Sequence, residues 1–150
     1  MKVASRGTVV ALSVLLVGGS ALAAPAWGSK DSSMVRAVND ARADHGLKPL
    51  RRAPRLTRSA RAYARWMLRA DYFGHRRRIR TRARFRRLGE TLSLHTGRRP
   101  RMRATLRGWL RSPPHRRLIL SKQFRWIGAG HARGRMHRRP STTWVLHLGG

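Results

Sequence analysis

The sequence predicts an α+β domain, because most helical patterns come first and two strand-like segments close the chain. The 150 residues are enough for one domain with a hydrophobic core. Hydrophobic residues make up 41% of the chain, too large a fraction for an ordinary disordered protein. Because no internal repeat is evident, residues 32–150 are interpreted as one compact unit.

The first helix is expected over residues 33–45, where apolar residues recur at helical spacing. Ser32 or Ser33 can cap its start, and Gly46 can end it. The segment LKPLRRAP that follows is expected to be a loop. Its Leu50 is expected to insert into the core.

A second helix is expected over residues 54–70, because proline tolerates the first helical position and an apolar stripe follows. This stripe consists of Leu56, Ala60, Tyr63, Ala64 and Met67. Gly74 is a natural stop after the helix. Residues 76–87 are almost all arginine and give no clear pattern.

The second half of the chain is expected to hold three strands and two helices. Their ranges are a strand over 87–94, helices over 101–111 and 114–120, and strands over 125–132 and 142–148. Residues 133–141, between the last two strands, are expected to form a turn or loop.

The charge balance is extreme, with 35 lysine and arginine residues against 5 aspartate and glutamate residues. Nearly all of the cations are arginine, and they are scattered along the chain. One interpretation is a surface that binds polyanions such as nucleic acid, anionic lipid or an acidic cell-wall polymer. The other is a solvated surface that a GC-rich genome has filled with arginine. Composition leaves both interpretations open.

The N-terminus predicts export. The segment MKVASRG is basic, an uncharged apolar run covers residues 8–24, and Ala21-Leu22-Ala23 fits the small-x-small rule for cleavage. We expect a signal peptide over residues 1–23, a linker over 24–31 and a secreted domain over 32–150. An uncleaved membrane anchor is the alternative, because the run reaches the short limit of a bilayer span. Export also argues against a nucleic-acid partner.

Several familiar sites are excluded by the residues. The chain has no cysteine, so it forms no disulfide and no thiolate metal site. No HxxxH, HExxH or CxxC spacing occurs, which argues against the zinc hydrolases that carry those motifs. No GxSxG motif and no glycine-rich phosphate loop is present either.

One histidine follows two prolines in the segment SPPHRRLIL. Pro113 precedes another proline and is expected to be extended, so Pro114 becomes the first helical residue. His115 then lies in the first turn, where the helix dipole and the two following arginines disfavour its charged form. A neutral imidazole can bind a metal or accept a hydrogen bond. The alternative is a histidine that only caps or packs at the helix start.

Glu90 is the only glutamate in the chain and lies between apolar residues in LGETL. It is interpreted either as a buried ion pair or cap, or as a carboxylate beside a functional histidine. His75, after YFG, is the other candidate of interest. The remaining histidines, at a helix end, in loops or in the late strands, are weaker candidates: His45, His95, His131, His137 and His147.

Six short segments follow one another along the chain, and their order is informative: VNDARADHGLKPL, YFGH, GETL, WLRSPPHRRLIL, FRWIGAGHARG and TTWVLHLGG. The first five resemble motifs of the CAP superfamily, the cysteine-rich secretory, antigen 5 and pathogenesis-related 1 proteins, also called the SCP domain, and TTWVLHLGG lies where the family's final strand ends. The resemblance covers about residues 35–149. Any one motif is weak, but five in order at plausible spacings are specific.

The resemblance implies an α-β-α sandwich with a small antiparallel sheet between helical layers. It also implies a shallow cavity lined by His75, His115 and Glu90, which in some members holds a divalent metal such as zinc. Ser112 stands where animal and plant members often carry a second glutamate, so half of the acidic lining is missing. Ser112 and the absence of cysteine match the bacterial members.

Three functions follow as hypotheses. The first is a secreted, monomeric, non-enzymatic binding module for a lipid, glycan or cell-envelope component. The second is a metal-assisted hydrolase, with His75 and His115 as metal ligands and Glu90 as base. The third is a cationic protein that binds anionic polymers or membrane surfaces through arginine.

Overall fold

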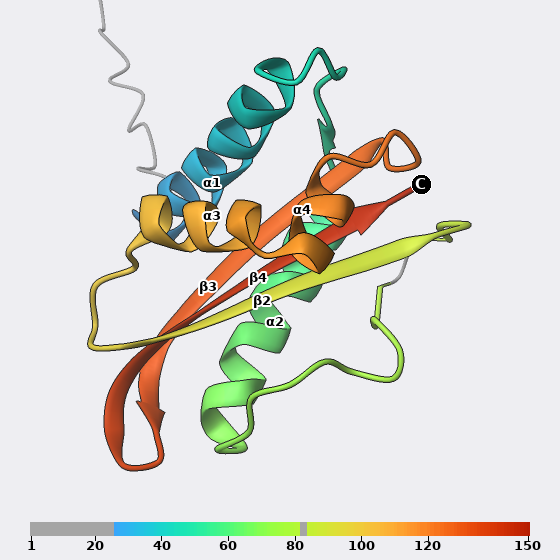
Figure 1. Ribbon diagram of the computed structural model, residues 1–150. Helices are drawn as coiled ribbons and strands as arrows, with labels where there is room; N and C mark the ends of the chain where they lie inside the picture. Colours follow the sequence, from blue (N-terminus) through green and yellow to red (C-terminus); the bar gives the residue numbers. More distant parts are fainter. Residues whose placement is uncertain (1–25, 82–83) are drawn as a thin grey trace, which may run out of the picture.

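The computed structural model describes residues 26–81 and 84–150 (Figure 1). Its elements are α1 (Ala26–Ala43), β1 (Arg51–Arg52), α2 (Pro54–Arg69), β2 (Leu88–Thr96), α3 (Met102–Arg111), α4 (Pro113–Ile119), β3 (Trp126–Met136) and β4 (Arg139–Gly149). The expected signal peptide, residues 1–23, lies outside the described residues. Within the described part, no helix combines the length and apolar character needed to cross a membrane.

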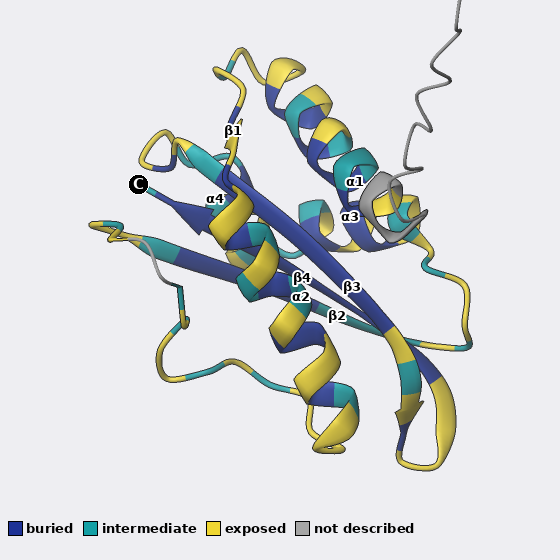
Figure 2. Ribbon diagram, turned by 180° about the vertical axis from the view of Figure 1, so that it is seen from behind, coloured by how far each residue is buried: buried dark blue, intermediate teal, exposed yellow. Residues whose placement is uncertain are grey.

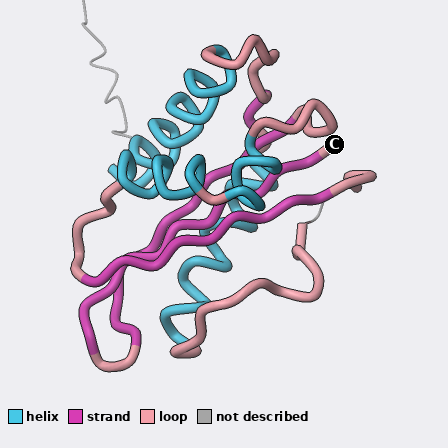
Figure 3. The backbone as a smooth tube through the Cα atoms, viewed as in Figure 1, coloured by secondary structure: helices cyan, strands magenta, loops and turns pink. Residues whose placement is uncertain are grey.

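The four strands form one sheet in the order β1-β3-β4-β2, with helices on both faces (Figures 1, 2 and 3). Helix α2 covers one face, and α1, α3 and α4 cover the other. This arrangement confirms the expected α-β-α sandwich. The long strands β2, β3 and β4 are antiparallel, whereas the short β1 pairs parallel to β3. The segment expected as a loop therefore adds a two-residue edge strand.

Alternation along β4 divides the core into two parts. Trp144 and Leu146 pack in the cluster under α1, α3 and α4, whereas Val145 packs under α2. The hydroxyl of Thr143 donates to the carbonyl of Ala64 on α2, as the same alternation requires. The predicted stripe of α2 is confirmed, since its members are all buried: Leu56, Ala60, Tyr63, Ala64 and Met67.

Two glycines of β3 let α2 lie close to the sheet. A Cβ atom at Gly128 would collide with the backbone nitrogen of Thr57, and one at Gly130 would collide with that of Arg61. Only residues without a side chain allow the helix backbone to approach so closely. The segment WIGAGHA is therefore a strand shaped to receive a helix.

Several element boundaries differ from the sequence-based expectation. Helix α1 begins at Ala26 rather than Ser33. Helix α4 begins at Pro113 rather than Pro114, and it is Ser112, the residue before the first proline, that is extended. The late strands are longer than expected, because the turn between them needs only His137 and Arg138, with φ angles of 48° and 65°.

Candidate functional site

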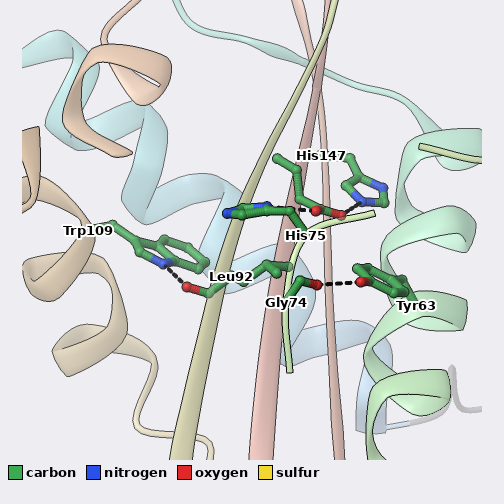
Figure 4. A network of polar contacts seen from close by, with 7 residues as sticks. Tyr63, Gly74, His75, Leu92, Trp109 and His147 are labelled. Carbon is green, nitrogen blue, oxygen red and sulfur yellow. Dashed lines mark hydrogen bonds and ion pairs between the residues drawn. The ribbon is translucent and has the colours of Figure 1, made fainter. Parts of the chain in front are cut away.

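The lone glutamate lies at the centre of a polar cluster. Its Oε1 atom is 2.9 Å from Nδ1 of His75, and its Oε2 atom is 2.9 Å from Nε2 of His147 (Figure 4). Glu90 on β2 and His147 on β4 are direct partners across the antiparallel ladder, and both are buried. Glu90 thus joins a histidine of its own sheet to a histidine from the loop after α2.

Contacts with Tyr63 hold the loop that carries His75 in place. The Tyr63 hydroxyl donates to the carbonyl of Gly74, and the Arg76 guanidinium lies 4.2 Å from the centre of the Tyr63 ring. Burial, followed by the charge of Glu90, raises the pKa of Tyr63, so its hydroxyl stays protonated and can donate. Both neighbours of His75 are therefore anchored to α2.

His115 lies at the start of α4, where its Nδ1 atom is 2.9 Å from Oγ of Ser112. Burial, followed by the charge of His75, lowers the pKa of His115. The expected neutral imidazole is therefore favoured. The causes are burial and the charge of a second histidine, neither of which the sequence suggested.

His75 and His115 each use only one of their two ring nitrogens in a hydrogen bond with a described residue. Each ring uses Nδ1 for its hydrogen bond, and no described residue bonds to either Nε2 atom. When Nδ1–H of His75 donates to Glu90, its Nε2 atom carries the lone pair that a metal requires. In the described ranges, however, no three His, Asp or Glu side chains are placed to hold a metal ion together.

His147 is the site residue that sequence reasoning ranked too low. A histidine within the apolar run TTWVLHL was a signal, because a polar side chain buried in a strand needs a partner. Its Nε2 atom contacts Glu90, but its buried Nδ1 atom has no hydrogen-bond partner in the part of the chain that is described.

A second buried polar cluster was not expected from the sequence. The carboxylate of Asp31 on α1 contacts Nδ1 of His131 on β3 at 2.7 Å and also pairs with Arg61 on α2. The His131 ring stacks on Trp144, with 4.7 Å between the ring centres. Asp31, assigned from the sequence to a linker, therefore fastens α1 to the sheet and to α2.

Two cavities lie away from the His75–Glu90–His147 cluster. One, of about 680 Å³, is lined by residues 46–49 and by basic side chains that include Arg42 and Lys122. Another, of about 530 Å³, lies at the start of α2 and is also rich in arginine. Neither is lined by His75, Glu90 or His115.

The sandwich and the order of its motifs agree with a comparison to known families. The model of the cysteine-rich secretory protein family, CAP, matches residues 35–148. This chain belongs to the CAP family. No match was found among curated proteins.

Solved structures show the same fold as this CAP domain. An outer surface protein from Borrelia burgdorferi is 17% identical, with a TM-score of 0.64 over 79% of this chain and 90% of that one. An extracellular SCP-domain protein from Bacillus anthracis is 20% identical, with a TM-score of 0.65 over 81% of this chain and 40% of that one. Venom allergen-like protein 4 from Schistosoma mansoni is 13% identical, with a TM-score of 0.64 over 80% and 87% of the two chains.

Ser112 lies at the start of α4 in this CAP domain, next to the ring of His115. It is the N-cap residue of α4 and has an extended backbone, and its hydroxyl contacts the ring of His115 instead of the helix amides. The position where the resemblance implied a second glutamate in other members therefore holds a neutral partner for a neutral histidine.

Proposed function

We propose that this CAP domain is an exported, non-enzymatic binding module whose ligand is an anionic component of the cell envelope. Its basic N-terminus and apolar run support export. Two of the similar structures, an outer surface protein and an extracellular protein, are consistent with that location.

The observation that carries the proposal is the position of arginines on α2. Exposed arginines recur along this helix at intervals that keep them opposite its buried stripe (Figure 2). We call these residues the α2 arginine stripe: Arg55, Arg58, Arg65 and Arg69. These arginines thus form one row on the surface, which suits an extended polyanion.

The polar cluster around Glu90 argues against the hydrolase hypothesis. A general base must reach a proton of the substrate. Glu90 is only 8% exposed, and both of its carboxylate oxygens already accept hydrogen bonds from histidines. This favours a structural role, in which Glu90 holds the loop of His75 on the sheet.

Binding to an anionic polymer tests the proposal. Retention on immobilised poly(glycerol phosphate) is measured against salt for the wild type, for R65Q/R69Q on α2, and for R103Q/R107Q on α3. Both double variants lose two exposed arginines, but the second pair lies on the opposite helical layer. We expect the α2 variant to reduce the slope of log affinity against log salt by about 1 to 2. The α3 variant should stay close to the wild type, whereas equal losses would contradict the proposal.

Metal binding through His75 and His115 is a second candidate function, favoured by their unbonded Nε2 atoms. Such a metal would take two imidazoles from the protein and would complete its coordination with water or a ligand. Zinc titration by calorimetry, with elemental analysis of the secreted protein, tests this. The variant H75A/H115A should lose any zinc that the wild type holds, while H45A/H137A should keep it. Zinc retained by both variants would refute the assignment.

A further inference from the structure

We propose that the cavity at the start of α2 binds the phosphate group of a small phosphate ester. This inference rests on the proposed function, which gives the domain an anionic ligand. It identifies that ligand as a phosphate ester and places it in one cavity. The cavity, of about 530 Å³, has a volume typical of small-molecule sites. It lies where the start of α2 meets β1, the start of β3, the end of β4 and the segment before β2.

Positive charge dominates the lining of this cavity. Five arginines line it, from two segments of the chain: Arg52, Arg55, Arg58, Arg84 and Arg86. No acidic side chain lines it, and the first turn of α2 contains none either. The fold therefore brings together arginines that are far apart in the sequence.

Most of these arginines have no carboxylate partner. No described residue forms an ion pair with Arg52, Arg58, Arg84 or Arg86. The carboxylates of Asp31, Asp71 and Glu90 are engaged elsewhere, with Arg61 and with histidines. Four like charges in one cavity that form no ion pair with a described residue favour the binding of an anion from solution.

Aromatic side chains complete the cavity and are held in place. Phe85 packs so closely on Gly149 that a Cβ atom there would collide with its ring. The Arg51 guanidinium lies 4.9 Å from the centre of the Trp126 ring, which also lines the cavity. Paired backbone hydrogen bonds of 3.0 Å between Arg87 and Gly150 fix the segment beside them. The aromatic part of the cavity is therefore held in place by the protein itself.

The number of arginines favours phosphate over a carboxylate. A guanidinium binds a phosphate or carboxylate through two parallel hydrogen bonds. A single carboxylate carries one charge, whereas a phosphate monoester carries nearly two and offers three oxygens to several arginines. The aromatic rings and the remaining volume can accommodate the organic part of the ester, such as a sugar ring.

Calorimetry on the secreted protein at 150 mM salt tests the site, with glucose 1-phosphate, inorganic phosphate and glucose as probes. The variant R58Q/R84Q removes two arginines of the cavity, and R103Q/R107Q removes two exposed arginines on α3, outside both the cavity and the α2 arginine stripe. We expect the first to weaken binding of both phosphate probes at least tenfold, and the second to weaken it less than twofold. Glucose should not bind. W126L should weaken binding of glucose 1-phosphate but not of inorganic phosphate.

Vesicles containing phosphatidic acid distinguish a lipid headgroup from a soluble ester. Binding of the soluble ester or of the vesicles that depends on Arg58 and Arg84 supports the site, and it identifies the source of the phosphate. Equal losses in the two double variants, or no binding of either phosphate source by the wild type, would overturn it. Polymer retention that depends on Arg65 and Arg69 would still stand in that case, so the two proposals fail separately.

Discussion

The Nε2 atom of His147 lies 2.9 Å from Oε2 of Glu90, directly across the ladder between β2 and β4. Because both side chains are buried, each supplies the hydrogen-bond partner that the other needs in a medium of low polarity. The second oxygen of Glu90 holds His75, so one cross-strand pair also positions a loop. Substitutions in this cluster should separate its structural role from any chemical one.

Glu90→Gln should destabilise the domain by about 1–3 kcal/mol, because two imidazole donors lose a charged acceptor. Denaturant unfolding followed by circular dichroism measures this free energy. Asp71→Asn is the control, since it removes the same charge from an exposed carboxylate that faces His137. Its cost should stay below about 0.5 kcal/mol. Similar losses in the two variants would show that net charge matters, rather than the buried contacts.

His147→Leu should be more destabilising than His75→Leu. The first change leaves a carboxylate oxygen buried without its partner, which costs about 3 kcal/mol. The side chain of His75 is 58% exposed, so water can replace its contact and the cost should be about 1 kcal/mol. Urea midpoints of the two variants give the comparison. A larger loss in His75→Leu than in His147→Leu would mean that Glu90 is stabilised mainly by its contact with His75 in the loop.

Gly130→Ala should destabilise the fold by about 3 kcal/mol or more, because its Cβ atom would collide with the backbone of α2 at Arg61. Gly108→Ala offers a matched control on α3, where a Cβ atom would meet nothing within 4 Å. Alanine there should stabilise the helix by about 0.5–1 kcal/mol. Thermal unfolding of both variants measures the difference. A tolerated alanine at position 130 would show that α2 can move away from the sheet.

Stability should fall as the pH drops below about 6.5, the ordinary pKa of histidine. Burial is the largest cause that lowers the pKa values of His95 and His115, followed by the charges of Arg101 and His75 respectively. His95 and His115 therefore bind protons more readily in the unfolded chain than in the folded chain, so acid favours unfolding.

The free energy of unfolding, measured at pH 7.5 and pH 5.5, checks this dependence. H95Q/H115Q removes both groups, and we expect a smaller loss between the two pH values than in the wild type. His137→Gln, which changes an exposed histidine, should keep the full loss. A double variant with an unchanged pH dependence would assign the effect to other groups.

Much of the fold could be predicted from the sequence, because helical periodicity is a property of neighbouring residues. The buried stripe of α2 followed from spacing, and the start of this helix followed from Pro54. Gly46 was expected to end the first helix because of its residue type; it has a φ angle of 64° and lies three residues after the end of α1 at Ala43. A turn was expected over residues 133–141, but its restriction to His137 and Arg138 was not, because neither is a residue type that usually marks a tight turn. Family resemblance implied a cavity lined by His75, Glu90 and His115, and of these residues the structure shows a contact between His75 and Glu90.

The sequence alone determined the α+β class and the main helices, and it singled out the lone glutamate as a candidate. Only the tertiary structure paired Glu90 with His147, 57 positions away, and Asp31 with His131, 100 positions away. It also brought the arginines of residues 52–58 and of residues 84–86 to one cavity. The reason is physical: local spacing shows which face of an element is buried, whereas the partner across that face depends on strand register and helix packing.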